Sequence, residues 1–99
     1  MNWKIYRINN SGVEKFLCEF KEAKSALYYT YQSSCVGNFI YSMRYGERGI
    51  LVYLDLRDRM CKPHRFAKDE ESGDGIKICD LSDYMNKIME IHHDKHQDC

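Results

Sequence analysis

The stretch that decides the fold is FIYSMRYGERGILVYLDL, residues 39–56. Two β-rich segments flank the tetrapeptide Gly46–Gly49, which predicts a turn between two antiparallel strands. The second segment, Ile50–Leu56, is a nearly continuous apolar run, which is typical of a strand covered on both faces. We therefore predict a central β-hairpin whose second strand is the most buried strand of the sheet.

Alternation also divides the first strand of this hairpin between two faces, with Tyr41, Met43 and Tyr45 on one and Ile40, Ser42 and Arg44 on the other. If helices cover only one face, large side chains on the other face are left for a protein partner or a second subunit. The competing interpretation is an ordinary core on both faces of the sheet.

The residues before the central hairpin predict another hairpin and a helix. Asn2–Ile8 and Val13–Phe20 are β-rich, and Asn9–Gly12 between them is a turn signal because Asn and Gly accept positive φ cheaply. Alternation places three side chains of the second strand on one face: Phe16, Cys18 and Phe20. From Lys21 to Ser33, apolar residues recur at steps of three and four, which predicts a helix.

The residues after the central hairpin are less regular. Arg57–Gly75 shows no periodicity, so we expect a long loop, and such loops are more often functional than not. Ile76–Ile78 predicts a short strand, and an amphipathic stripe predicts a helix from Leu81 to about His93, before a frayed polar tail, 93–99. The order β-β-α-β-β-(β)-α predicts one compact α+β domain over residues 1–99. Its antiparallel sheet has four to five strands, and its two helices pack on one face.

Net charge, apolar runs and cysteine spacing argue against several classes of function. Lys and Arg number 15 together, as do Asp and Glu, so the formal net charge is zero, which argues against a general attraction to nucleic acid or an anionic membrane. No run approaches the ~20 apolar residues of a membrane span, and the first residues lack the apolar stretch of a signal peptide. Five irregularly spaced cysteines then predict free thiols, and we expect a cytoplasmic protein.

A zinc site is one hypothesis for the binding chemistry. Cys61 and His64 have a spacing that places two donors on one turn. His96 and Cys99 form a second pair, with His92 as a substitute ligand. Because zinc needs about four N or S donors, these two pairs would complete one structural site. The competing interpretation is a solvated helix C-terminus, where the helix dipole favours histidine.

The segment 57–74 is split in charge. Its basic residues are Arg57, Arg59, Lys62, Arg65 and Lys68. Phe66 lies among them and would stack on a base if the partner were a nucleic acid. Four acidic residues follow between Asp69 and Asp74 and weaken any attraction to phosphate, so we expect a protein partner in preference to nucleic acid. The competing interpretation is a solvated loop whose two halves neutralise each other.

The first predicted helix carries Tyr28, Tyr29 and Tyr31, which at 100° per residue cannot all face the sheet. We expect at least one of them to be exposed, and Tyr28 and Tyr29 are candidates for contact with a partner. The competing interpretation places these rings at the edge of the core.

Catalytic motifs are missing from the sequence. It holds no Gly-rich phosphate loop, no His-Glu-x-x-His and no Gly-x-Ser-x-Gly, so we expect no enzyme. The leading hypothesis is a small stand-alone protein-binding domain that inhibits or regulates a larger macromolecular complex. Small regulators of phages and mobile elements offer an analogy. One alternative is a zinc-stabilised nucleic-acid-binding module that uses the basic 57–68 segment and the His-rich tail. Another is a small enzyme that uses Cys61 or the pair Asp55 and Asp58.

Overall fold

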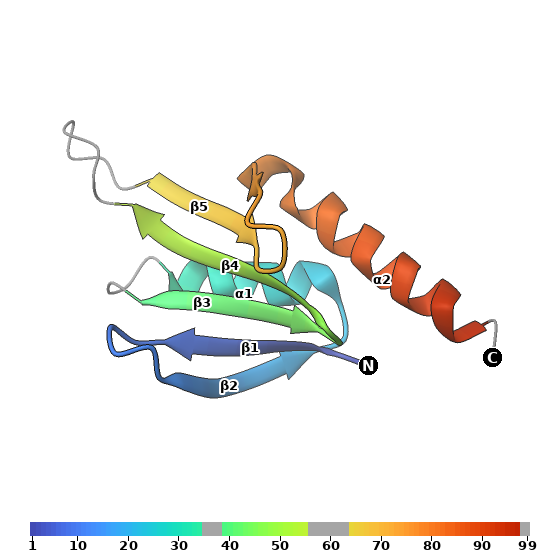
Figure 1. Cartoon of the computed structure of the whole chain (residues 1–99), viewed down its shortest axis with the longest axis horizontal. Helices are drawn as coiled ribbons and strands as arrows, with labels where there is room; N and C mark the ends of the chain where they lie inside the picture. Colours follow the sequence, from blue (N-terminus) through green and yellow to red (C-terminus); the bar gives the residue numbers. More distant parts are fainter. Residues whose placement is uncertain (35–38, 56–63, 98–99) are drawn as a thin grey trace.

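The computed structural model of the chain describes residues 1–34, 39–55 and 64–97, and the side chains of residues 1–34, 39–53 and 66–92. Six antiparallel strands form one sheet in the order β2-β1-β3-β4-β5-β6 (Figure 1). The strands are β1 Trp3–Ile8, β2 Glu14–Phe20, β3 Ile40–Tyr45, β4 Arg48–Asp55, β5 His64–Asp69 and β6 Gly75–Ile76. The helices are α1 Ala23–Ser33 and α2 Leu81–Gln97, the second preceded by a 3₁₀ turn, Ile78–Asp80. The predicted α+β class is confirmed, with one strand more than the four to five expected.

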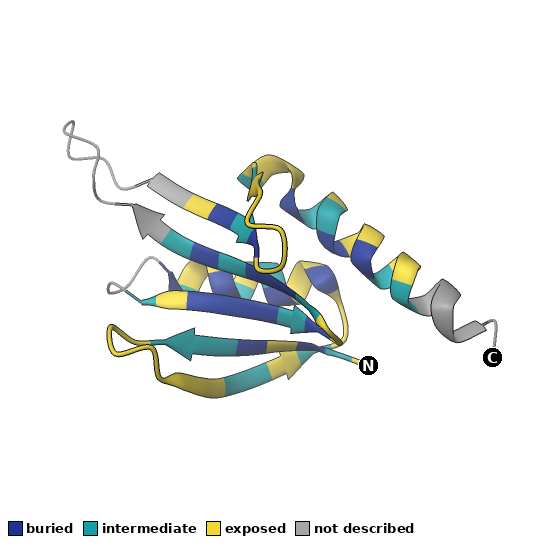
Figure 2. Ribbon diagram, viewed as in Figure 1, coloured by how far each residue is buried: buried dark blue, intermediate teal, exposed yellow. Residues whose placement is uncertain are grey.

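Both helices pack on the same face of the sheet. That face supplies most of the core: Trp3, Ile5, Tyr41, Met43, Tyr45, Ile50, Val52 and Ala67. The helices complete it with Ala23 and Ala26 of α1 and Leu81, Met85 and Ile88 of α2. Figure 2 shows the buried residues gathered in the central strands and along one side of each helix. The predicted division of β3 into two faces is confirmed, because Tyr41, Met43 and Tyr45 all lie in this core.

The central hairpin closes more tightly than predicted. Tyr45 pairs with Arg48, so Gly46 and Glu47 alone form the turn, and the expected four-residue loop is wrong. Gly46 has φ of +61°, which a residue with a Cβ adopts only with strain. The prediction that the second strand, β4, is covered on both faces is also wrong. Its residues Leu51 and Tyr53 are half-buried and point away from both helices.

A β-bulge in β2 changes the predicted face of Phe16. Cys18 pairs with Ile5, but Phe16 pairs with Tyr6, so Leu17 is an extra residue without a partner in β1. The bulge reverses the alternation, and Phe16 therefore lies on the face opposite Cys18 and Phe20. The prediction that all three share a face is wrong.

The largest difference from the prediction is β5, which lies inside the expected loop. It pairs with β4 from Ile50↔Asp69 to Asp55↔His64. The inward residues of β5 with described side chains are Ala67 and Asp69, so the strand lacks the apolar alternation that marks strands in a sequence. The short strand predicted at 76–78 is found as β6, Gly75–Ile76, which starts one residue earlier and ends two residues earlier, and Ile78 begins the 3₁₀ turn.

The last helix is longer than predicted and ends at Gln97. It begins beside β5 and runs outward past the end of the sheet at which the chain starts (Figure 1). Among the described residues, neither helix has both the length and the apolar character that crossing a membrane requires.

Candidate protein-binding surface

The face of the sheet turned away from both helices, here called the open face, carries a row of apolar side chains. Ile8 pairs with Ile40 in β1 and β3, and Tyr53 pairs with Phe66 in β4 and β5. Because Tyr41 pairs with Val52, the preceding Ile40 lies next to Tyr53, so the four residues form one line across four strands. The rings of Tyr53 and Phe66 stack with their centroids 6.0 Å apart.

A second row lies beside the first and includes Phe16, Tyr6 and Leu51. The rings of Phe16 and Tyr6 meet edge to face at 5.6 Å. Phe16, Ile40 and Phe66 keep 51%, 37% and 42% of their surface exposed, respectively. Antiparallel sheets that face water on one side normally carry polar residues there. The open face therefore exposes more apolar surface than solvent contact alone explains.

Arg44 forms ion pairs with two acidic side chains on the open face. Arg44 lies flat on Tyr6, with its guanidinium carbon 4.5 Å from the ring centroid. Its two terminal nitrogens donate to the Glu14 carboxylate at 2.9 and 2.5 Å. Its Nε donates to Ser42 Oγ at 2.9 Å, and that hydroxyl donates to Glu70. The hydrogen bond from Arg44 lowers the pKa of Glu14 and in turn raises the pKa of Arg44.

Gly49 makes this arrangement of charges possible. The Glu70 side chain passes over Gly49 on its way to Ser42, and a Cβ at Gly49 would collide with the Glu70 carboxylate. The polar side chains therefore lie flat along the sheet beside the apolar rows. The result is a surface on which Arg44 is paired with Glu14 and Glu70 beside the apolar rows.

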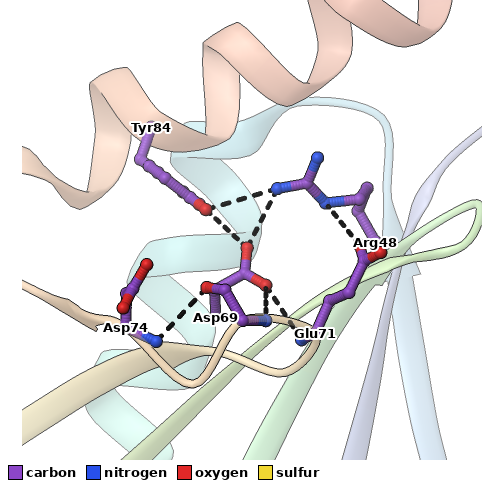
Figure 3. A network of polar contacts seen from close by, with 6 residues as sticks. Arg48, Asp69, Glu71, Asp74 and Tyr84 are labelled. Carbon is purple, nitrogen blue, oxygen red and sulfur yellow. Dashed lines mark hydrogen bonds and ion pairs between the residues drawn. The ribbon is translucent and has the colours of Figure 1, made fainter.

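A polar network on the other face fixes α2 to the sheet (Figure 3). The Asp69 carboxylate, which is 1% exposed, accepts hydrogen bonds from Tyr84 at 2.5 Å and from Arg48 at 3.0 Å. Its other oxygen accepts from the backbone N–H groups of Glu71 and Ser72 at 2.9 and 3.1 Å. Burial raises the pKa of Asp69, but these hydrogen bonds outweigh burial, and the pKa falls to about 2. The network joins β4, β5 and α2, and every polar atom of the carboxylate is used internally.

The structure separates the residues that the sequence predicted as one partner-binding set. Phe66 and Lys68 lie on the open face, because their neighbours Ala67 and Asp69 point to the helices. Tyr28 lies on α1, across the molecule from that face, and is 68% exposed.

The remaining residues of the predicted partner-binding set are half-buried on α1 or lack described side chains. Tyr29 is half-buried on α1, where its ring packs 5.5 Å from Phe20. Burial is the largest cause of a raised pKa for Tyr29. Arg57, Arg59 and Lys62 lie outside the described residues, and Arg65 is described only as backbone of β5.

The proposed zinc ligands are placed only in part. Cys61 and Cys99 lie outside the described residues, and His64 and His96 are described only as backbone of β5 and α2. The start of β5 and the end of α2 lie at opposite ends of the molecule (Figure 1). The side chain of His92 is described, and its ring meets Tyr45 edge to face at 5.3 Å. Within the described part of the chain, no three His, Cys, Asp or Glu side chains gather as a metal site would require.

Sequence reasoning missed Phe16 and Tyr6 as members of the open face. The bulge at Leu17 decides the face of Phe16, and no residue of β2 signals that bulge in advance.

Comparison of the chain with known protein families, with curated proteins and with solved structures finds no match. A functional assignment therefore depends on the geometry and charge of the open face.

Proposed function

We propose that this chain is a protein-binding domain that acts by occupying its partner, as an inhibitor or regulator of a larger complex does. The open face is the contact surface. The observation that carries this proposal is the two exposed apolar rows on a sheet face that neither α1 nor α2 covers, with Phe16, Ile40 and Phe66 still 37–51% exposed. Contiguous apolar surface on a small protein marks interaction sites more often than not.

The layout of the open face matches the anatomy of protein interfaces. Such interfaces have an apolar, aromatic centre and a polar rim, and a few aromatic or Arg residues contribute most of the affinity. Here the aromatic pair Tyr53–Phe66 lies in the apolar row, and Arg44 is immobilised by two carboxylates. Side chains that are already fixed lose little entropy on binding, which favours association.

The charge of the open face favours a protein over a nucleic acid. Three basic side chains lie on it, Lys4, Arg44 and Lys68, and three acidic ones offset them, Glu14, Glu19 and Glu70. A phosphate backbone would meet no net positive charge there. Mixed charge of this kind fixes the orientation in which a protein partner binds. The basic residues between Asp55 and His64 in the sequence would attract an acidic partner and raise its rate of association.

The experiment compares capture of a partner by matched variants. The wild-type chain, Phe66→Glu and Ile91→Glu are immobilised and exposed to the same lysate. Ile91 is the control because it is 51% exposed but lies on α2, away from the open face. We expect one dominant protein to be retained by the wild type and by Ile91→Glu and lost by Phe66→Glu. Far-ultraviolet circular dichroism confirms that each variant is folded.

Equal retention by all three variants would overturn the open face as the contact surface, and retention of no protein would overturn the proposed function. Reversal of Arg59 and Arg65 to Glu tests the steering role of the basic segment, and weaker capture is expected. Binding to random DNA and RNA tests the nucleic-acid alternative. We expect no affinity that falls steeply between low and physiological salt, because phosphate contacts always produce such a slope.

A further inference from the structure

The exposed side of α1 forms a second surface, separate from the open face. Tyr28 projects from it, 68% exposed, and a hollow lies on each side of this ring. The larger hollow, about 730 Å³, lies between α1 and the end of β2 and is lined by Phe20, Ser25 and Tyr29. The smaller, about 320 Å³, is lined by Leu27, Tyr31 and Ile78. A projecting aromatic ring and two largely apolar hollows therefore share one surface.

This surface is complementary to itself. Lys24, Tyr28 and Gln32 are spaced four residues apart and form a ridge along α1, and helices pack by placing such ridges into grooves. In a two-fold dimer, each copy presents the same patch to the other. Two copies can therefore each insert Tyr28 into a hollow beside the Tyr28 of the other.

The charges of α1 select the antiparallel orientation. The first turn of α1 contains Lys24 and no acidic residue, and its last turn contains no basic residue. The N-cap residue Glu22 suits the partially positive N-terminus, but no basic residue of the last turn balances the partially negative C-terminus. In an antiparallel pair centred on Tyr28, Lys24 of one copy lies beside Gln32 of the other. Each lysine then meets the partially negative end of a helix, and the two helix dipoles oppose each other.

We propose that α1 binds α1 of a second copy of this chain in an antiparallel pair, around a two-fold axis at Tyr28. This inference does not depend on the proposed function, because the pair leaves both open faces free. One short helix face buries less than the ~800 Å² per partner of a standard interface, so the dimer is weak. We therefore expect the dimer to dissociate on dilution and to form only at high protein concentration.

Sedimentation equilibrium of the whole chain from 5 µM to 1 mM, with reducing agent to keep the thiols free, measures the dissociation constant of the dimer. Tyr28→Ala is expected to raise it about tenfold or more. Ser25→Trp keeps Tyr28 but fills the larger hollow, and it is expected to weaken the dimer similarly. The matched control Ile91→Ala removes a comparably exposed apolar side chain from α2 and is expected to leave the constant unchanged.

Lys24→Glu separates this proposal from a general loss of stability. An acidic residue in the first turn of α1 suits its own dipole, so the melting temperature should rise slightly. The same residue repels the C-terminal end of the partner helix, so the dimer should weaken. A chain that stays monomeric to 1 mM overturns the proposal. So does a dimer that Tyr28→Ala and Lys24→Glu leave intact, or one that Phe66→Glu on the open face abolishes.

Discussion

Substitution of Asp69 by Asn tests whether the buried polar network holds α2 on the sheet. The substitution preserves the size of the side chain and removes its charge. The Asn oxygen can still accept the backbone N–H groups of Glu71 and Ser72, which donate to Asp69 at 2.9 and 3.1 Å. The charge-assisted bonds from Tyr84 and Arg48 are lost, so the free energy of unfolding should fall.

The lowered pKa of Asp69 indicates how much free energy of unfolding Asp69→Asn should remove. The pKa falls from 3.8 to about 2 in the folded chain. Since one pKa unit corresponds to ~1.36 kcal/mol, the charged form contributes about 2 kcal/mol to the free energy of unfolding near neutral pH. Asp69 is 1% exposed but Arg48 is 38% exposed, so solvent screens part of this interaction and about 2 kcal/mol is an upper value. For a chain of this length, a loss of about 2 kcal/mol lowers the melting temperature by roughly 8–16 °C.

The sign of the pH dependence follows from the lowered pKa. The stabilisation is fully present above pH 4 and disappears as the pH falls through about 2, because the folded carboxylate is then protonated. The difference in stability between the wild type and Asp69→Asn should therefore shrink over this interval. Tyr84→Phe removes one donor and should cost about half as much, roughly 1–1.5 kcal/mol.

Urea unfolding followed by fluorescence measures these differences. Trp3 is the single tryptophan and is fully buried beside Tyr45, so its emission reports unfolding directly. Asp74→Asn is the matched control, since Asp74 lies in the same turn with its side chain exposed. A difference below about 0.5 kcal/mol for Asp69→Asn at pH 7 would refute the reasoning. So would a difference that is undiminished at pH 2.

Three further outcomes are expected. Gly49→Ala should cost about 0.5–1.5 kcal/mol in urea unfolding, because its Cβ displaces Glu70 and breaks the bond to Ser42; no change would mean that the bond contributes nothing. Met43→Ala should cost about 2–5 kcal/mol, because Met43 is fully buried at the centre of the core, and a cost below 1 kcal/mol would contradict that placement. The zinc hypothesis predicts about one equivalent of metal in protein purified without chelator and a lower melting temperature for Cys61→Ser. Fewer than ~0.2 equivalents by elemental analysis would exclude it.

Local sequence patterns determined the central hairpin and the second helix. The two faces of β3 follow from strict alternation, and Leu81, Met85 and Ile88 form a stripe at helical spacing. Both patterns depend on residues a few positions apart, so they can be read without knowing any long-range contact. The exposure of at least one of Tyr28, Tyr29 and Tyr31 was predictable for the same reason, because they cannot all face one side of a helix, but which of them is most exposed was not.

The tertiary structure alone decided β5 and the composition of the open face. An acid at an inward strand position is tolerated because Tyr84 and Arg48, both distant in the sequence, donate hydrogen bonds to Asp69. The face of Phe16 depends on a bulge that appears only when β2 pairs with β1. The separation of Tyr28 from Phe66 depends on which face of the sheet the helices cover. Each of these features depends on contacts between distant segments, which periodicity along the chain does not encode.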